Sequence, residues 1–153
     1  MKIKIISFTK SEENHIREGI EVYLKRLLHY TRIEEIIIKP PKEAEITQQV
    51  KKEAELLKQK ITDEDLIVLL DDKGKSFTSQ EFANWLTTNM NSGRKSVCFI
   101  IGGAYGFSEE IYKRSNEKLS LSRMTLPHQL AKLVFTEQLY RAFTIIKGEK
   151  YHH

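Results

Sequence analysis

The positions of hydrophobic residues along the chain predict five strands. Residues 2–8 (KIKIISF) alternate between polar and apolar side chains and are rich in β-branched residues, which is typical of a strand. Residues 65–70 (DLIVLL) and 96–101 (SVCFII) are continuously apolar instead, as in strands that are buried on both faces. We expect strands at residues 2–8, 33–39, 65–70, 96–101 and 118–121.

Five helices are expected between and after these strands, because apolar residues recur there at helical spacing. Ser11 is a suitable N-cap for the first helix, and Ser108 caps a short fourth helix that ends near Arg114. The last helix spans residues 127–146, with Thr125 as its N-cap and Pro127 in its first turn, where the missing N–H costs nothing. The apolar positions of the second helix are Ile46, Val50, Ala54, Leu57 and Ile61.

The alternation of strands and helices predicts an α/β fold. Continuous apolar central strands indicate a parallel sheet with helices on both faces. The length of 153 residues is that of one domain, and no repeat or linker divides the chain. We therefore expect a single domain over residues 1–153.

The last predicted helix is apolar around most of its circumference. Such a helix must be buried nearly all round, and the sheet of a small domain covers only one side of it. We expect a second copy of the chain to cover the other side, so that the protein is a homodimer. The apolar positions are Leu130, Leu133, Val134, Phe135, Leu139, Tyr140, Ala142, Phe143 and Ile146.

Composition narrows the class of protein. With 40% hydrophobic and 30% charged residues, the chain is typical of a globular protein. Cys98, the single cysteine, excludes a disulfide framework and favours a reducing cytoplasm. No apolar run approaches the roughly 18 residues of a membrane span, and MKIKIISF lacks the features of a signal peptide. We expect a cytoplasmic protein without a membrane segment.

The net charge of +4 permits an anionic partner such as RNA without requiring one. Most of the excess lies from Arg123 onward, where Lys132, Arg141, Lys147 and Lys150 outnumber the acidic residues. An ordinary solvated helix face would carry the same charge, so both interpretations stay open.

The loops after the strands are the places to look for a ligand, because open parallel sheets bind ligands beyond the carboxyl ends of their strands. The first loop, SFTKSE, has no glycine, which argues against a dinucleotide oxidoreductase. Residues 71–76 (DDKGKS) end like a phosphate-binding P-loop, but Leu69 stands where that motif requires glycine. This segment is interpreted as a polar turn, or as a loop in which Asp71 faces a polar group of a ligand.

Two later segments could form the walls of a pocket. Residues 102–106 (GGAYG) carry three glycines, which permit close approach of a ligand, although a plain tight turn would use them too. Residues 119–130 (LSLSRMTLPHQL) offer hydroxyl groups and apolar side chains together. A flat, partly apolar ligand such as adenosine would suit these walls. The hydroxyls belong to Ser120, Ser122 and Thr125, and the apolar side chains to Leu121, Met124 and Leu126.

The sequence contains no recognisable motif for a catalytic nucleophile or for a metal site. The chain has no GxSxG segment and no cysteine pair. His128, His152 and His153 lack metal-ligand spacing to Cys, Asp or Glu, so no metal site is expected. On the residues alone, His152-His153 is compatible with part of a purification tag.

GGAYG, LSLSRMTLPHQL, LYRAF and the final YHH together resemble the small SPOUT-class methyltransferases that methylate N3 of a pseudouridine in 23S ribosomal RNA. The resemblance covers the whole chain. It implies an α/β sheet whose C-terminal part forms a deep trefoil knot, a homodimer, and S-adenosylmethionine bound in the knot. It also favours a native tail over a tag.

The resemblance assigns roles to particular positions. It places Tyr151 and His152 near the active site and gives Arg141 contact with RNA or cofactor, although Arg141 could equally pair with Glu137 on the same helix. The implied cofactor-binding residues are Leu70, Gly102, Gly103, Leu121, Ser122, Arg123, Met124, Thr125 and Leu126.

The implied reaction needs an in-line arrangement of N3 and the methyl group, and loss of the N3 proton. His152 is the best base by residue type, and Arg141 could stabilise the resulting oxygen anion. A dimer would carry a charge of only about +8, so we expect structured RNA in an assembled ribosome as the substrate. The alternative is a non-catalytic nucleotide- or RNA-binding α/β module.

Overall fold

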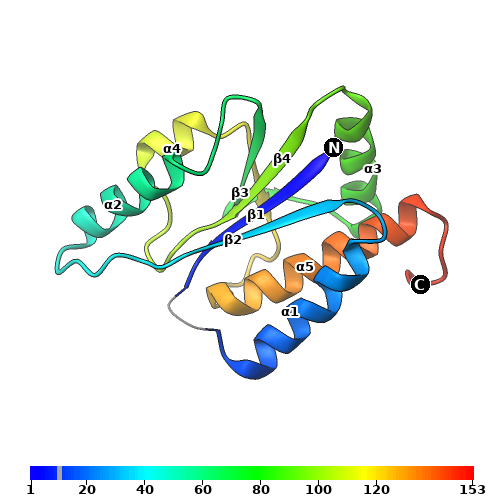
Figure 1. Cartoon of the computed structure of the whole chain (residues 1–153), viewed down its shortest axis with the longest axis horizontal. Helices are drawn as coiled ribbons and strands as arrows, with labels where there is room; N and C mark the ends of the chain where they lie inside the picture. Colours follow the sequence, from blue (N-terminus) through cyan, green and yellow to red (C-terminus); the bar gives the residue numbers. More distant parts are fainter. Residues whose placement is uncertain (10–11) are drawn as a thin grey trace.

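A computed structural model describes residues 1–9 and 12–153 (Figure 1). Five strands form one parallel sheet in the order β2-β1-β4-β3-β5, so the predicted α/β class and parallel sheet are confirmed. The strands are β1 (Lys2–Phe8), β2 (Arg32–Ile38), β3 (Asp65–Ser76), β4 (Ser96–Ile101) and β5 (Glu117–Ser120).

Helices cover both faces of the sheet, as the sequence predicts (Figure 1). α1, α3 and α5 pack on one face, and α2 and α4 pack on the other. The helices are α1 (Asn14–Leu27), α2 (Ile46–Lys58), α3 (Ser79–Asn91), α4 (Glu109–Arg114) and α5 (His128–Ile146).

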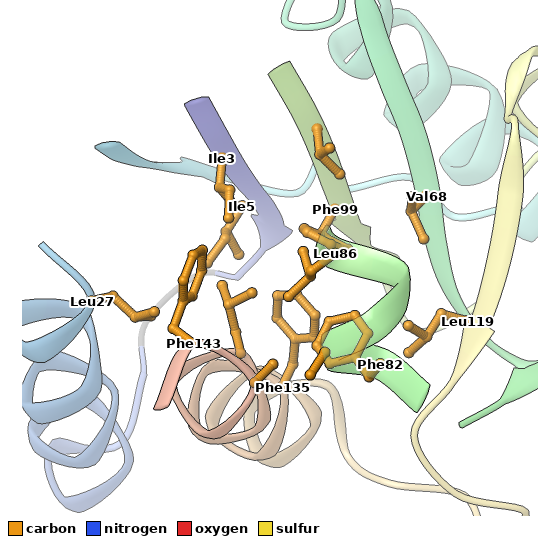
Figure 2. Packing of buried hydrophobic residues seen from close by; sticks show 14 of the residues in the cluster. Ile3, Ile5, Leu27, Val68, Phe82, Leu86, Phe99, Leu119, Phe135 and Phe143 are labelled. Atoms are coloured by element: carbon orange, nitrogen blue, oxygen red, sulfur yellow. The ribbon is translucent and has the colours of Figure 1, made fainter. Parts of the chain in front are cut away.

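The core on the α1, α3 and α5 face is built around aromatic side chains (Figure 2). The rings of Phe99 on β4 and Phe135 on α5 lie with their centroids 4.7 Å apart, and Phe82 of α3 packs edge-on against Phe99. All six residues of β4 are buried, as expected for its continuous apolar run. Strand β4 is therefore covered on both faces by the packed helices.

Most of the apolar surface of helix α5 is buried by other parts of the same chain. It lies on the sheet between α1 and α3, and its residues Phe135, Leu139 and Phe143 are almost fully buried. The ring of Phe143 stacks on Tyr30, which follows α1, with centroids 5.7 Å apart. The apolar circumference of α5 therefore does not by itself require a second copy of the chain.

The helix termini differ in part from the expected ones. Ser108 caps α4, because its hydroxyl accepts a hydrogen bond from the Ile111 N–H at 3.2 Å. Thr125 is not the N-cap of α5: Pro127 takes that position with no side-chain bond, one residue before the first turn. Ser11 lies outside the described residues, and Glu13 is the N-cap of α1.

Strand β3 is longer than its apolar run. Residues 71–76, expected as a polar turn, continue the strand, and after an irregularity Lys75 and Ser76 pair with β5. A Cβ atom on Gly74 would lie only 2.6 Å from the backbone nitrogen of Leu119. Because real Cβ atoms do not approach backbone so closely, glycine is required here for the chain to pass β5. The glycine that imitates a P-loop thus permits close packing of β3 against its neighbour β5.

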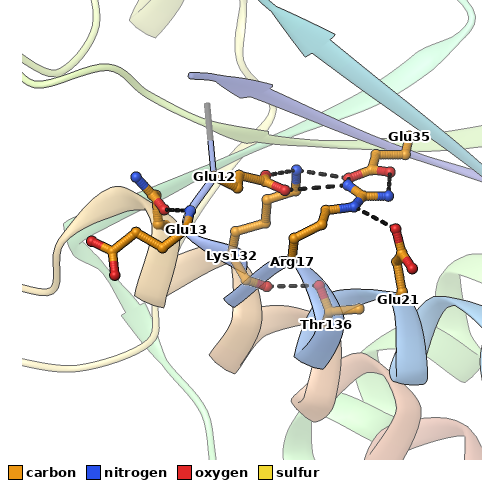
Figure 3. Close-up of polar contacts among 8 residues, drawn as sticks. Glu12, Glu13, Arg17, Glu21, Glu35, Lys132 and Thr136 are labelled. Atoms are coloured by element: carbon orange, nitrogen blue, oxygen red, sulfur yellow. Dashed lines mark hydrogen bonds and ion pairs between the residues drawn. The ribbon is translucent and has the colours of Figure 1, made fainter. Parts of the chain in front are cut away.

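A buried cluster of charged residues ties α5 to α1 and β2 (Figure 3). Lys132 is 2% exposed, and its ammonium lies 2.5 Å from a Glu12 carboxylate oxygen and 2.7 Å from one of Glu35. Arg17 donates two hydrogen bonds to Glu35, at 2.7 and 3.0 Å. Burial opposes ionisation of Glu35, but its bonds to Arg17 and Lys132 outweigh burial and lower its pKa. Lys132 is therefore not part of a solvated basic face.

Candidate functional site

A cavity of about 730 Å³ lies beyond the carboxyl end of β4, next to the middle of β3. Most of the residues around it come from the middle of β3, the glycine-rich loop after β4, and the segment between β5 and α5. They are Leu70 to Lys73, Ile101 to Phe107, Tyr112, Leu121, Ser122, Met124 to His128, and Ala131. The two walls expected from the sequence therefore face one space.

Most of the residues predicted to bind the cofactor line this cavity. The eight that do are Leu70, Gly102, Gly103, Leu121, Ser122, Met124, Thr125 and Leu126. Arg123 lies in the same segment, but it is exposed and does not line the cavity. Cofactor binding by these residues remains a prediction, and their common location is what the fold adds.

The segment between β5 and α5 is shaped by its own serines. The Ser120 hydroxyl donates to the Ser122 carbonyl oxygen at 3.0 Å, and the Ser122 hydroxyl accepts from the Met124 N–H at 2.9 Å. Such local bonds hold irregular backbone in place of a strand or a helix. Met124 is 78% exposed at the rim. The serines therefore fix the loop, while Leu121 and Leu126 supply apolar wall.

The glycine-rich loop is held tightly on both sides. A Cβ on Gly102 would lie 3.0 Å from the Phe107 ring, and one on Gly103 would lie 2.7 Å from the Oε2 atom of Glu53. Gly106 has a φ of 75°, a left-handed conformation that favours glycine. Nothing in the sequence pattern indicated that Gly103 makes room for a glutamate on α2.

Asp71 places a negative charge at the cavity wall. Its Oδ2 accepts from the Tyr112 hydroxyl at 2.5 Å, and its Oδ1 accepts from the Lys73 N–H at 2.8 Å. Burial raises the pKa of Asp71, but these hydrogen bonds outweigh burial and hold it below the usual range. Burial and the bond to Asp71 raise the pKa of Tyr112 to about 12. The wall therefore favours a ligand group that is cationic or donates hydrogen bonds.

The three predicted catalytic residues lie elsewhere. Arg141 donates to the Oε1 atom of Glu137 at 2.6 and 3.1 Å, so the expected ion pair is present. The Tyr151 hydroxyl donates to the same oxygen at 3.0 Å, and the Arg141 guanidinium lies 4.7 Å from the Tyr151 ring centroid. His152 is exposed. The structure brings Arg141 and Tyr151 together.

Arg141 lies away from the cavity within one chain. It follows Ala131, the last residue of α5 that lines the cavity, by ten positions. At 1.5 Å per residue, the two are about 15 Å apart along the helix axis. One chain therefore does not bring Arg141 to the predicted cofactor pocket.

A second cavity of about 510 Å³ adjoins the first at the same edge of the sheet. It lies at the carboxyl ends of β1, β2 and β4. Its other lining residues are Phe8, Thr9, Pro40 to Glu43, Gln49, Glu53 and Gln129, and it shares Gly103, Ala104, Tyr105 and His128 with the first cavity. Sequence reasoning missed it, because Glu53 looks like one more polar position of an amphipathic helix.

The described residues hold no group of three or more side chains that could bind a metal ion. Within the same part of the chain, every helix is too short or too polar to cross a membrane.

Comparison with known proteins identifies the class to which this chain belongs. The model of the family described as "Predicted SPOUT methyltransferase" matches residues 1–152. The chain therefore belongs to the SPOUT methyltransferase family and is a methyltransferase, as the resemblance in the sequence implied. Membership excludes the non-catalytic binding module and the dinucleotide oxidoreductase.

Individual relatives narrow the comparison. The chain is 47% identical to the ribosomal RNA large subunit methyltransferase H of Christiangramia forsetii, over 100% of this chain and 99% of that protein. The proteins of the same name from Flavobacterium psychrophilum and Carboxydothermus hydrogenoformans are 48% and 44% identical, over at least 99% of both chains.

Proposed function

We propose that this protein transfers a methyl group from S-adenosylmethionine to N3 of a pseudouridine in 23S ribosomal RNA, within assembled ribosomes or large subunits of the cytoplasm. The observation that carries the proposal is the 730 Å³ cavity between the glycine-rich loop and residues 121–128, in a chain of this family. The names of the relatives support a large-subunit RNA as the substrate.

The residues around the cavity suit S-adenosylmethionine. The volume falls in the range of small-molecule sites, about 300–1,000 Å³. Leu70, Leu121 and Leu126 offer apolar surface to an adenine ring, and the glycine-rich loop lets backbone groups approach the ligand. Asp71 offers a negative charge to the cationic part of the cofactor. When bound, S-adenosylmethionine supplies an electrophilic methyl group on a sulfonium.

The C-terminal part of the chain is proposed to form the trefoil knot of the family. Two features support this. Residues 71–76 approach the backbone of β5 closely at Gly74, and the chain then passes from β5 at the sheet edge to α5 on the α1 and α3 face. The cavity lies between residues 70–73 and the segment after β5, so a knot would hold these two walls in a fixed relation.

A homodimer is proposed because Arg141 lies away from the cavity within one chain. Arg141 is about 15 Å along α5 from Ala131, the last residue of this helix that lines the cavity. If Arg141, Tyr151 and His152 act in the reaction, a second copy must bring them to the cavity. Exposed apolar side chains near α5 support such a contact: Met124 is 78% exposed and Leu130 is 37% exposed.

In this arrangement the partner copy supplies the proton chemistry. N3–H of a uracil-type ring is weakly acidic, so methylation needs a base and a cation that favours the anion. His152, exposed on the tail, is the proposed base. The bond to Glu137 raises the pKa of Arg141, which therefore stays charged and can stabilise the developing oxygen anion. Tyr151 fixes the guanidinium from its open side.

Mass spectrometry of ribosomal RNA from a deletion strain tests the proposed reaction. We expect the deletion to remove one 3-methylpseudouridine from 23S RNA, the wild-type gene to restore it, and a gene encoding His152→Ala to fail. An unchanged nucleoside profile would exclude the reaction, and full restoration by His152→Ala would exclude His152 as the base.

Thermal stability with ligands tests the cofactor separately. S-adenosylmethionine and S-adenosylhomocysteine should raise the melting temperature by mass action, and NAD should not. Stabilisation by NAD alone would contradict the assignment of the cavity. Activity on assembled subunits but not on a bare RNA hairpin is expected, and equal rates would overturn the assembled substrate.

A further inference from the structure

Glu53 on α2 is a buried carboxyl group with one oxygen left over. The residue is 3% exposed, and its Oε1 accepts a hydrogen bond from the Gln49 side-chain amide at 2.8 Å. Its Oε2 is buried and has no hydrogen-bond partner among the described residues. Buried polar atoms in folded proteins are nearly always paired, so an exception requires an explanation.

The neighbours of Glu53 hold its carboxyl group on two sides, and Oε2 is the oxygen nearest to Gly103. The side-chain oxygen Oε1 of Gln49 accepts a hydrogen bond from the Glu43 backbone N–H at 3.1 Å, which leaves the side-chain nitrogen Nε2 of Gln49 to face Glu53. On the other side, the Glu53 carboxyl group lies where a Cβ of residue 103 would stand, and Gly103 has none. The carboxyl group is therefore clamped between Gln49 and the glycine-rich loop.

Glu53 lines the 510 Å³ cavity, whose volume falls within the range of small-molecule sites. Phe8, Pro40 and Pro41 give it apolar wall, and Lys42 stands exposed at its rim, where it could meet a phosphate. The cavity shares Gly103 and His128 with the proposed cofactor cavity. A base in the smaller cavity could therefore present one edge to Glu53 and the adjoining edge to the methyl donor.

Pseudouridine has the donor that Glu53 lacks. Its ribose is attached at C5, so its ring keeps an N1–H group, separated from N3 by the C2 carbonyl. Uridine places C5–H at the equivalent position, which is not a hydrogen-bond donor of comparable strength. A ring with N3 toward the cofactor cavity would thus direct either N1–H or C5–H toward a neighbouring acceptor.

We propose that the 510 Å³ cavity binds the acceptor base and that Glu53 accepts a hydrogen bond from N1–H, so that Glu53 distinguishes pseudouridine from uridine. This inference rests on the proposed function and adds the residue that selects the substrate. Burial also raises the pKa of Glu53, which shows how poorly solvated the carboxyl group is without a ligand.

A paired-substrate assay with Glu53→Gln tests this. Because Gln49 has only its amide nitrogen to offer, Gln at position 53 must keep its carbonyl oxygen toward Gln49 and turn its NH₂ group toward N1–H. The substrates are large subunits from two strains that both lack this gene, one of which also lacks the synthase that makes the target pseudouridine. The quantity measured is the ratio of kcat/KM for the pseudouridine and uridine subunits.

We expect wild type to prefer pseudouridine and Glu53→Gln to lower kcat/KM on pseudouridine by about 10- to 100-fold, with little change on uridine. Glu55→Gln, an exposed change on the same helix, should keep the wild-type ratio.

Two outcomes would overturn the inference: an unchanged ratio in Glu53→Gln, or an equal loss on both substrates together with loss of S-adenosylhomocysteine binding in a thermal shift. Absence of methyl transfer by wild type to either substrate is a different result, because it contradicts the proposed function itself.

Discussion

Lys132 and Glu53 are both buried charged residues, but their surroundings differ. Lys132, on the α1 and α5 side of the sheet, is 2% exposed and lies between the carboxylates of Glu12 and Glu35, with Arg17 completing the cluster. Glu53, on the α2 side, is 3% exposed and has one hydrogen-bond partner for two oxygens. Full pairing is what a structural cluster needs, whereas a spare buried acceptor at a cavity is what a ligand site needs.

The largest effect is expected from breaking the Lys132 cluster. Lys132→Met keeps the volume but removes the buried cation between the Glu12 and Glu35 carboxylates, which are then left with Arg17 as their shared partner. Loss of one partner of a buried pair costs about 3–5 kcal/mol. Urea unfolding at pH 7 measures the change.

The matched control is Lys95→Met, which breaks an exposed pair with Glu64 and should cost less than about 1 kcal/mol. Similar losses in the two variants would contradict the structural role of the Lys132 cluster.

The next effect concerns the space that Gly103 leaves for Glu53. Gly103→Ala puts a Cβ about 2.7 Å from the Glu53 Oε2 atom, and overpacking of this kind costs about 1–3 kcal/mol. Glu53→Ala in the same chain should relieve most of that loss, because it removes the clashing group. A double-mutant cycle from urea unfolding gives the coupling, and strictly additive changes would show that the two residues do not touch.

The pH dependence of stability should have opposite signs at the two sites. The pKa of Glu35 is lowered from 4.5, so its contribution is present above pH 4.5 and is lost as pH falls through the folded-state value. The pKa of Glu53 is raised from 4.5, so the folded state is penalised as pH rises from 4.5 through the folded-state value.

Unfolding free energies from pH 3 to 8 measure this difference. Relative to wild type, Glu35→Gln should lose stability as pH rises, and Glu53→Gln should gain stability as pH rises, because an amide at position 53 carries no charge to desolvate. Parallel slopes in the two variants would refute the contrast.

The smallest effect is expected at Asp71, which is paired but lines a cavity. Tyr112→Phe removes a 2.5 Å hydrogen bond from Asp71, so the carboxylate is less firmly oriented and its pKa rises. Calorimetry with S-adenosylhomocysteine should show affinity reduced about threefold to tenfold. Ser96→Ala loses a 2.5 Å bond to Asp65 at the amino ends of β3 and β4, the opposite edge of the sheet, and should bind like wild type. Equal affinity in wild type, Tyr112→Phe and the control variant would contradict a contact between Asp71 and the ligand.

Local patterns were sufficient for most of the fold. The right elements were identified from the continuous apolar runs in β3 and β4 and from the helical spacing around Phe82. This is possible because the spacing of apolar residues along a strand or helix reflects which of its faces are buried. The glycine-rich loop and residues 121–126 were found as cavity walls for the same reason: they follow strands whose carboxyl ends share an edge.

Contacts between distant segments could not be predicted in this way. The extension of β3 and the need for Gly74 depend on close packing against β5, more than forty positions away. The burial of Lys132 depends on Glu12 and Glu35, and the place of Glu53 depends on Gly103 fifty positions later. In the sequence, Lys132 and Glu53 look like ordinary polar residues of their helices, because the residues that they contact lie on other elements.

The most direct test of the account is methyl transfer in vitro. Purified protein is incubated with S-adenosylmethionine labelled in its methyl group and with large subunits from a strain that lacks the gene, and the RNA is digested to nucleosides. The account predicts that the label appears in 3-methylpseudouridine alone. Absence of label in the RNA, or label in any other nucleoside, would contradict it.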